Sequence, residues 1–526
     1  MKTKIFSLLL IAIFALSISA QAQDIGGDDI LISEISSEDA GFPKISVADN
    51  GWIYILTYTY CSAAPYTSLM LHCSKDDGVT YQKLKEWKLS VNITYSDADM
   101  VVTGNSEANI NVWIAFAVNN SDDNSSTICV SKHAADGTFI EAPYTYKNIG
   151  FKAYRIAIAT DYRSPGDGAS PFAIGIAFTD YVNSSNKSWV NYAYSLDGGN
   201  TFNLKSLQSA IGERQFGRID ISLGRSRYDK FGMVGIAFEM GDAPQGFNSW
   251  RNIGFLANYM DYRNTHAWSA PVNISKVITS GENNTRNPKV QWFGNKDVNP
   301  TIHGTNSFNF IVAFDQKFND HDFDINYIYP ATSFKIDAGY TPALSDFEYT
   351  ALGEEESIEH NVALSFDKQY NHYLATYIEY GSSFKIKYKY INADKIHDKA
   401  NWVDLGSYSN DDAYSTSIDI SPTKNMVCWA WSEGSSIWAD TEWSTVGIEN
   451  HEISTNALNA YPNPASNVLN IVSENANELI TICDLSGKVV YSEQASEKQS
   501  SIDISQLSAG MYIVRIGDKA VKLVKE

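Results

Sequence analysis

The feature that most constrains this chain is a short strand pattern that recurs seven times. Each copy is apolar at alternate positions and ends in Ala or Thr followed by an aromatic residue. The copies read YILTY, VWIAF, IGIAF, VGIAF, FIVAF, YLATY and VCWAW. Their final aromatics are Tyr58, Phe116, Phe178, Phe238, Phe314, Tyr377 and Trp431, which by subtraction lie 54 to 76 residues apart. A period near sixty residues built from strands is typical of four-stranded propeller blades rather than of solenoid coils.

A second short strand precedes each copy at a similar distance. These segments are residues 43–47, 99–103, 155–159, 218–222, 288–292, 361–365 and 417–421. Turn residues such as Asp49-Asn50-Gly51 separate the two strands, which indicates a hairpin whose first strand is the innermost of its blade. The last copy ends early, and an unassigned strand at 29–35 could complete it and cover an exposed sheet edge. We therefore predict a propeller of seven blades within residues 23–445, with six blades as the alternative.

Composition agrees with an all-β protein. The chain has 526 residues, 44% of them apolar and 13% aromatic, and no segment keeps a helical period. Such a length exceeds one ordinary domain unless the chain is a repeat array. The formal net charge of -21 argues against binding to nucleic acid or to an anionic membrane surface through the overall field.

The first 22 residues read as a signal peptide. Lys2 and Lys4 precede an apolar run at 5–18, and Ala20-Gln21-Ala22 fits a small-x-small cleavage site after Ala22. No cysteine follows that site, so a lipid anchor is not expected. No later apolar run approaches the roughly 20 residues needed to span a bilayer. We expect export to the periplasm and, beyond it, a secreted or outer-membrane-surface location.

The cysteines do not form a recognisable framework. They are Cys61, Cys73, Cys129, Cys428 and Cys483. Their spacing matches no metal site, and an odd number cannot all pair within one chain. We interpret them as buried small apolar residues. Cys61 and Cys73 are the one close pair and a possible disulfide.

Two segments share a turn pattern at equivalent positions of the first and third copies. They are Ser74-Lys-Asp76-Asp-Gly78-Val-Thr80-Tyr81 and Ser195-Leu-Asp197-Gly-Gly199-Asn-Thr201-Phe202. The pattern resembles the Asp-box, or BNR repeat, of sialidase-like β-propellers. Ser and Asp oxygens would accept turn N–H groups while Gly takes a positive φ. We therefore predict a structural rather than catalytic role for Ser74, Asp76, Gly78, Ser195, Asp197 and Gly199.

The repeat of apolar strands ends at Thr445, and the composition of the sequence changes after it. A polar linker, 446–455, leads to a module at 456–526 with short alternating strands of its own. Its motifs include Tyr461-Pro-Asn-Pro-Ala-Ser466, Asp484-Leu-Ser-Gly-Lys488 and Gly510-Met-Tyr-Ile-Val-Arg515. In this order they resemble the type A sorting domain of the type IX (Por) secretion system. The resemblance implies an immunoglobulin-like β-sandwich.

That resemblance also implies partners. A domain of this kind addresses a folded passenger to an outer-membrane translocon and is normally removed by the sortase of the system. The passenger can remain attached to surface lipopolysaccharide. A signal peptide at one end and a sorting domain at the other predict a protein exported in two steps.

One polar column runs through the repeats. The residue that opens each inner strand is polar in all seven copies: Lys44, Asp99, Arg155, Arg218, Lys289, Asn361 and Ser417. Because inner strands line the central channel of a propeller, we expect these side chains to ring one mouth of it. Acidic residues follow the Ala-aromatic strands, on loops expected to leave toward the same face: Asp180, Glu239, Asp315, Glu379 and Glu433.

From this column we derive a candidate ligand site. Its members are Lys44, Arg155, Arg218, Lys289, Asp180, Asp315 and Glu379. Cations inside an acidic rim could hold a glycan or a protein ligand, with the cations gripping a carboxylate. The alternative is that these charges only pair with one another or with water. Asp320, Asp322 and Asp324 could chelate Ca²⁺ but lack the Gly and distal Glu of a calcium loop, so we expect no metal and no cofactor.

Catalysis of the sialidase type is the alternative to binding. Such enzymes share a first-blade [FY]-R-I-P motif, an arginine triad, a Tyr/Glu nucleophile pair and an Asp acid/base. Here the first inner strand reads Phe42-Pro43-Lys44-Ile45, and no arginine precedes Arg155. Lys cannot reproduce the fork of a guanidinium. We therefore favour a binding propeller, with a sialidase-like glycoside hydrolase of non-standard site as the alternative, and assign no catalytic residue.

Overall fold

Strands make up nearly all the regular structure of this chain. The computed structural model describes residues 29–34, 42–58, 67–90, 92–162, 171–182, 188–207, 215–225, 231–241, 252–261, 266–277, 285–293, 307–319, 322–331, 334–335, 343–352, 357–367, 371–381, 384–410, 413–421, 423–424, 426–443, 459–472, 479–484, 489–494, 499–516 and 519–525. The chain divides into two compact units, residues 1–444 and 445–526. The signal peptide with its cleavage site after Ala22 and the linker at 446–455 lie outside the described residues.

Helices are few and short in the described ranges. They are the 3-10 turns η1 (Ile274–Val277), η2 (Leu344–Asp346), η3 (Ala393–Lys395) and η4 (Lys399–Asn401). None of the helices in these ranges has the length and apolar character of a membrane span. The all-β prediction is therefore confirmed.

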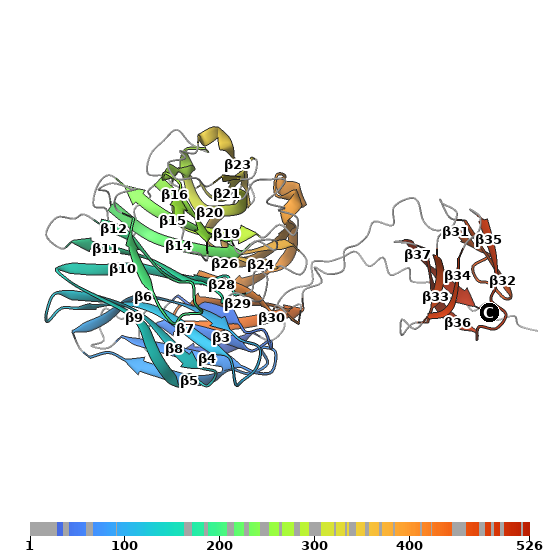
Figure 1. The fold of residues 1–526 in the computed structure, drawn as a ribbon, viewed down its shortest axis with the longest axis horizontal. Coiled ribbons are helices and arrows are strands. Elements are labelled where there is room, and N and C mark those ends of the chain that lie inside the picture. The colour runs from blue at the N-terminus through green and yellow to red at the C-terminus, as the bar shows by residue number, and fades with distance from the viewer. Residues whose placement is uncertain are drawn as a thin grey trace, which may run out of the picture. The chain divides into compact units, whose positions relative to one another are not determined.

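Among the described residues, the strands of the first unit form seven antiparallel sheets, called blades 1 to 7 in chain order (Figure 1). Blade 1 contains β2 (Lys44–Val47), β3 (Ile53–Tyr58), β4 (Ser68–Ser74) and β5 (Gln82–Lys88). Blade 2 contains β6 (Ile93–Thr103), β7 (Asn111–Asn120), β8 (Ser125–Ala134) and β9 (Phe139–Ile149). Blade 3 contains β10 (Phe151–Thr160), β11 (Ile174–Val182), β12 (Ser188–Ser195) and β13 (Asn203–Ser206). Blade 4 contains β14 (Gln215–Arg225), β15 (Phe231–Gly241), β16 (Asn252–Asp261), β17 (His266–Trp268) and β18 (Val272–Asn273). Blade 5 contains β19 (Thr285–Phe293), β20 (Ser307–Asn319), β21 (Asp322–Pro330), β22 (Phe334–Lys335) and β23 (Phe347–Ala351). Blade 6 contains β24 (Ile358–Asp367), β25 (His372–Tyr380), β26 (Phe384–Asn392) and β27 (Val403–Asn410). Blade 7 contains β28 (Ala413–Ser421), β29 (Met426–Glu433), β30 (Ser436–Trp443) and the N-terminal strand β1 (Ile30–Glu34).

The sheets are arranged as a ring. The first strand of each blade packs against the first strand of the next, and β28 of blade 7 packs against β2 of blade 1. Seven apolar clusters fill the spaces between neighbouring blades. One joins Tyr192 of blade 3 to Phe238 of blade 4, and another joins Ile53 of blade 1 to Cys428 of blade 7. This arrangement is a β-propeller whose inner strands surround its centre.

The N-terminal strand closes the ring. β1 pairs antiparallel with β30, so that Ile30 lies opposite Ala439 and Glu34 opposite Ser436. Blade 7 thereby gains the outer strand that its own stretch of sequence lacks. The prediction that residues 29–35 complete the last blade is confirmed.

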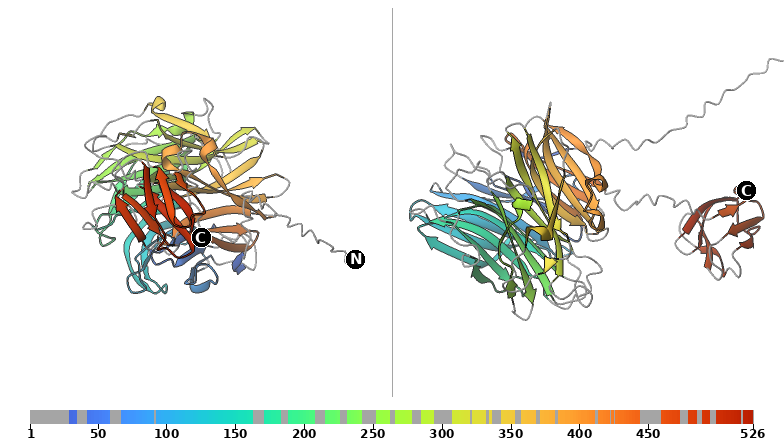
Figure 2. Two further views of the ribbon diagram at one scale, coloured as in Figure 1. Left: turned by 90° about the vertical axis from the view of Figure 1, so that its right-hand side faces the viewer. Right: turned by 90° about the horizontal axis from the view of Figure 1, so that it is seen from above.

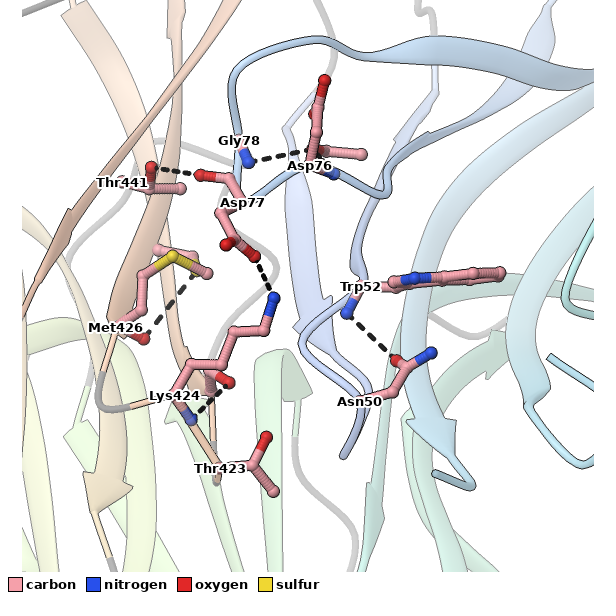
Figure 3. A network of polar contacts seen from close by, with 12 residues as sticks. Asn50, Trp52, Asp76, Asp77, Gly78, Thr423, Lys424, Met426 and Thr441 are labelled. Atoms are coloured by element: carbon pink, nitrogen blue, oxygen red, sulfur yellow. Dashed lines mark hydrogen bonds and ion pairs between the residues drawn. The ribbon is translucent and has the colours of Figure 1, made fainter. Parts of the chain in front are cut away.

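Polar contacts join blade 1 to blade 7 at this seam (Figure 3). Lys424, which precedes β29, forms an ion pair with Asp77 of the β4–β5 turn. The hydroxyl of Thr441 on β30 donates to the carbonyl oxygen of Asp77 over 2.8 Å, and the Thr423 hydroxyl donates to the carbonyl oxygen of Asp49 over 2.6 Å. The turn that resembles an Asp-box is therefore part of the closing contact.

The C-terminal unit is a small two-sheet sandwich (Figure 2). One sheet contains β31 (Asn459–Tyr461), β32 (Val468–Val472) and β35 (Gln499–Asp503), and the other β34 (Val489–Gln494), β33 (Leu479–Cys483), β36 (Gly510–Ile516) and β37 (Lys519–Lys525). Its core includes Leu469, Ile480 and Val514. The Tyr461–Ser466 motif meets the last strand, because the N–H of Val524 donates to Asn463 Oδ1 over 2.9 Å.

Candidate functional site

A cavity of about 340 Å³ lies at the centre of the ring. It is lined by the inner strands of all seven blades, since each contributes side chains to its wall. The seven residues of the polar column are all in that wall: Lys44, Asp99, Arg155, Arg218, Lys289, Asn361 and Ser417. The four cations of the candidate site are thus brought together from blades 1, 3, 4 and 5.

A β-bulge at the same end of six inner strands shapes the mouth of this cavity. The pairing with the second strand shifts between Tyr95 and Asp97, Ala153 and Arg155, Phe216 and Ile219, Arg286 and Lys289, His360 and Ala363, and Ala413 and Ser415. A bulge adds one residue to a strand and redirects the side chains beside it. Asn287 and Asn361 lie at two of these bulges with φ of 55° and 58°, a conformation that Asn tolerates better than most residues.

Carboxylates of the cavity wall bind the inner strand of the following blade. Asp97 Oδ2 accepts from the N–H of Ile156 over 3.1 Å, and Asp220 Oδ2 accepts from the N–H of Val290 over 2.8 Å. Asp419 Oδ2 accepts from the N–H of Val47 over 2.8 Å, across the closing seam. The innermost strand of each sheet has an edge without a partner strand, so these side chains satisfy N–H groups that would otherwise face the channel.

Two of the four cations are neutralised within the wall. Lys44 Nζ lies 3.5 Å from Asp99 Oδ1, and Lys289 Nζ lies 3.4 Å from Asp220 Oδ1. Burial alone would lower the pKa of Lys44, but the carboxylates of Asp99, Asp97 and Asp220 outweigh it and raise that pKa. Burial raises the pKa of Asp220, against the opposing effect of Lys289. Both lysines are therefore charged partners of carboxylates, with little charge left for a ligand.

The two arginines are placed differently. Arg155 Nη1 donates to the carbonyl oxygen of Ser96 over 3.5 Å. The Arg218 guanidinium has no ion pair with a carboxylate in the described ranges, and its carbon lies 6.0 Å from the centroid of the Phe42 ring. Burial and then the nearby charge of Arg155 lower the pKa of Arg218, against the opposing charges of Glu239 and Asp315. A carboxylate or sulfate placed beside these two side chains would relieve their repulsion.

Glu239 fixes the backbone next to Arg218. Its Oε2 accepts from the N–H of Arg218 over 3.0 Å, and its Oε1 accepts from the N–H of Asn287 over 2.9 Å, so it joins blades 4 and 5. The carboxylate runs over Gly217, where a Cβ atom would overlap it. Glycine is therefore required at position 217, because the Glu239 carboxylate approaches its Cα closely. Both carboxylate oxygens of Glu239 accept hydrogen bonds from backbone N–H groups.

The acidic rim expected around the cations is not formed, which corrects the sequence-based interpretation. Asp180, Asp315 and Glu379 lie inside β11, β20 and β25 rather than on loops, and none of the three lines the cavity. The strands continue beyond the Ala-aromatic pairs, so the acids that follow are still in the sheet. Their side chains serve contacts between strands.

Each of these acids has its own partners. Asp315 is fully buried, accepts from the N–H of Asn361 over 3.1 Å and lies 3.6 Å from Arg286 Nε. Asp180 is 3% exposed and accepts from Asn191 Nδ2 over 3.1 Å, and burial raises its pKa to about 6. Glu379 lies 3.9 Å from Lys387 Nζ.

The wall also contains residues that were not singled out as site residues from the sequence, among them Phe42, Tyr58, Asp97 and Asn287. Burial and then the carboxylate of Asp97 raise the pKa of Tyr58, with which Asp97 interacts. Asp97 precedes Asp99 by two residues, and residues two apart in a strand lie on one face. The sequence could therefore have predicted that Asp97 lines the cavity beside Asp99. Asn287 gave no comparable signal, because its position depends on a bulge.

The turns that resemble Asp-boxes lie at the opposite end of the blades. Ser74 Oγ accepts from the N–H of Gly78 and Asp76 Oδ1 from the N–H of Thr80, both over 2.9 Å. Ser195 and Asp197 repeat these two contacts with Gly199 and Thr201, again over 2.9 Å. Ser74 pairs with the first residue of β3, whereas the mouth lies at its last residue, Tyr58. The carboxylates of both turns are therefore engaged by their own backbone, far from the cavity mouth.

No group of three or more metal-ligating side chains occurs in the described ranges. Asp320 lies outside them, and Asp322 begins β21. Cys73, Cys129, Cys428 and Cys483 are buried and not joined in disulfides, and Cys61 lies outside the described residues.

Comparison with known proteins identifies the C-terminal module. Residues 459–526 match the family model described as the secretion system C-terminal sorting domain. The module is therefore such a sorting domain, and it implies export through the type IX secretion system to the cell surface or beyond. The search of curated proteins found no match.

Several solved structures resemble the propeller. One is an α-L-arabinofuranosidase from Fusarium graminearum (11% identity, TM-score 0.36, covering 71% of this chain and 100% of that chain). Another is a polysaccharide lyase, an ulvan lyase, bound to an oligosaccharide of GlcA and Rha3S (11%, 0.45, 80% and 99%). A third is an intramolecular trans-sialidase from Ruminococcus gnavus in complex with oseltamivir carboxylate (11%, 0.38, 80% and 98%). These likenesses concern the fold alone.

Proposed function

We propose that this chain, whose C-terminal domain directs export through the type IX secretion system, binds an acidic carbohydrate in the central cavity of its propeller. The observation that carries the proposal is the state of Arg218. This guanidinium lines the cavity next to Arg155 and has no carboxylate partner in the described ranges, whereas Lys44 and Lys289 are both paired. Glu239 and Asp315 act on this guanidinium only from a distance, and an anionic group on a ligand would supply a direct ion pair.

The rest of the wall suits a sugar ring. Phe42 lies within 6.2 Å of both Tyr58 and Tyr414 by ring centroids, so aromatic surface adjoins the arginines. Asn361 and Ser417 of blades 6 and 7 also line the cavity. There the Asn361 amide donates to the carbonyl oxygen of Tyr414 and accepts from the Asn287 amide, and Ser417 Oγ accepts from the N–H of Ile45. An aromatic surface beside a few directional polar groups is the usual composition of a small-molecule site.

A glycoside hydrolase is the second candidate, because Tyr58 and Asp97 lie near both arginines. Nucleophilic catalysis by a tyrosine requires an activated hydroxyl. Here burial and the Asp97 carboxylate raise the pKa of Tyr58, and Asp97 also holds the N–H of Ile156. These contacts favour binding over turnover.

The test is a comparison of mature protein variants on an array of acidic and neutral glycans. We expect acidic glycans to bind and Arg218→Met to weaken binding by about 10- to 100-fold, since hydrogen bonds to charged groups contribute about 1.5–3 kcal/mol. Lys75→Met is the matched control, because Lys75 pairs with Glu107 near the β4–β5 turn, away from the cavity mouth. Equal binding by the Arg218→Met variant would refute the assignment.

The hydrolase alternative is tested with the same protein. We expect no release of sialic acid from a fluorogenic sialoside. Turnover by the wild-type chain that is lost on Arg218→Ala would overturn this expectation and replace binding by catalysis.

A further inference from the structure

Two aromatic side chains, one exposed and one half-buried against the apolar cluster between blades 6 and 7, lie where β25 ends and β26 begins in blade 6. Tyr380 ends β25 and is 43% exposed, and Phe384 begins β26 opposite it. Their ring centroids are 4.7 Å apart and the ring planes are inclined by 44°. A Cβ atom at Gly381, next in the turn, would meet nothing within 4 Å. Tyr380 therefore carries most of the exposed surface of this pair.

This aromatic pair lies on the mouth side of the propeller. Tyr380 pairs with Ile358, the first residue of β24, while Asn361, three residues later on the same strand, lines the central cavity. A strand rises about 3.3 Å per residue, so the pair is about 10 Å along the strand from the cavity wall. That separation suits neighbouring units of one sugar chain better than a single ring.

Further aromatic and basic groups lie near the start of β24. His360 lies between Ile358 and Asn361, and its ring centroid is 4.9 Å from that of Phe323 on blade 5. Lys317 Nζ lies 5.7 Å from the centroid of Phe323. Aromatic and basic groups of blade 5 thus lie beside His360 of blade 6.

Exposed aromatic rings and sugars are complementary for a physical reason. The C–H faces of a pyranose ring are apolar and can bury area on an aromatic ring while the hydroxyl groups stay in water. Aromatic side chains lose little conformational freedom when they bind. Tyr380 and Phe384 present such a surface from paired positions of two neighbouring strands.

We propose that Tyr380 and Phe384 form an outer subsite, so that the protein binds an acidic oligosaccharide chain with one unit in the central cavity and a later unit on blade 6. This inference rests on the proposed function and adds to it the class of ligand, a chain rather than a single sugar.

The experiment is affinity electrophoresis of the mature protein in gels that contain alginate, polygalacturonate, chondroitin sulfate or hyaluronan. We expect at least one polymer to retard the wild-type chain. Tyr380→Ala and Phe384→Ala should each weaken that retention about 3- to 10-fold, and Tyr380→Phe should preserve it. The matched control is Tyr349→Ala, since Tyr349 is 47% exposed on the outer strand β23 of blade 5. Each variant is checked for an unchanged Tm.

The outcomes separate the two proposals. If retention is lost on Arg218→Met but unchanged by Tyr380→Ala and Phe384→Ala, the outer subsite is wrong and the central site stands. If no polymer retards the chain while glucuronate, galacturonate or another acidic monosaccharide binds it, the ligand is a single sugar and the outer subsite is again wrong. Retention that depends on Tyr380 but not on Arg218 refutes the central site, and binding of no acidic sugar or polymer refutes both.

Discussion

Asp180 illustrates at the residue scale how burial changes the role of a side chain. It was expected at the rim of a ligand site, but it is 3% exposed and hydrogen-bonded to Asn191. Desolvation disfavours a carboxylate, which is why its pKa rises from 3.8 to about 6. At neutral pH the buried Asp180 carboxylate is ionised, and its desolvation lowers the free energy of unfolding.

Replacing Asp180 by Asn should therefore stabilise the protein at neutral pH. Between pH 4 and 6 the unfolded chain ionises Asp180 while the folded chain keeps its proton, so the free energy of unfolding falls as pH rises through this window. Below about pH 4 both states are protonated. We expect Asp180→Asn to gain up to about 3 kcal/mol at pH 7 and little at pH 4, measured by urea unfolding. The same gain at both pH values would contradict the assignment.

At the element scale, each turn that resembles an Asp-box joins two blades as well as two strands. A Cβ atom at Gly199, which has a φ of 89°, would overlap the indole of Trp113 on blade 2. The β12–β13 turn therefore rests on the preceding blade, as the β4–β5 turn rests on Thr441 of blade 7. The motif supports the ring through contacts that its own residues do not reveal.

Asp197→Ala should weaken the fold without affecting ligand binding. The carboxylate accepts from the N–H groups of Asn200 and Thr201 and from the Thr201 hydroxyl. Water can replace part of these contacts, so we expect a loss of about 1–2 kcal/mol in the free energy of unfolding. Asp197→Asn keeps an acceptor oxygen and should lose less. A catalytic or binding role would instead appear as lost glycan binding at unchanged Tm.

At the scale of the whole molecule, ring closure depends on residues from both ends of the propeller sequence. β1 supplies the outer strand of blade 7 and is only half-buried, with Leu31 40% exposed. The closing seam is also held by the cluster that contains Ile53 and Cys428 and by the Lys424–Asp77 ion pair. Exposed ion pairs contribute little, so the strand and the apolar cluster are the main contacts.

Deleting residues 29–35 should open blade 7. The edge of β30 would lose its four residue pairs with β1 and expose unpaired N–H and C=O groups. We expect Tm to fall by about 5 to 10 °C and aggregation to increase, measured by thermal unfolding and light scattering. Deletion of residues 23–28 alone is the control. An unchanged Tm in the longer deletion would show that the strand is dispensable.

Much of this architecture could be predicted from the sequence because its causes are local. The alternation of apolar residues predicted the inner and second strands of all seven blades. Turn residues predicted the β4–β5 and β12–β13 hairpins. The free strand near the N-terminus predicted the closure by β1. The motifs at 459–526 predicted the sorting domain. Local backbone preferences and side-chain periodicity act over a few residues, so one sequence displays them directly.

Only the tertiary structure decided which charges could face a ligand. The seven-membered column was evident from the strand pattern. The pairing of Lys289 with Asp220, and the lack of an ion pair at Arg218 among the described residues, depend on side chains from other blades. Bulges placed Asn287 in the wall, and continued strands buried Asp180 and Asp315. These features join residues about sixty positions apart, and desolvation and charge pairing depend on distance in space rather than on sequence separation.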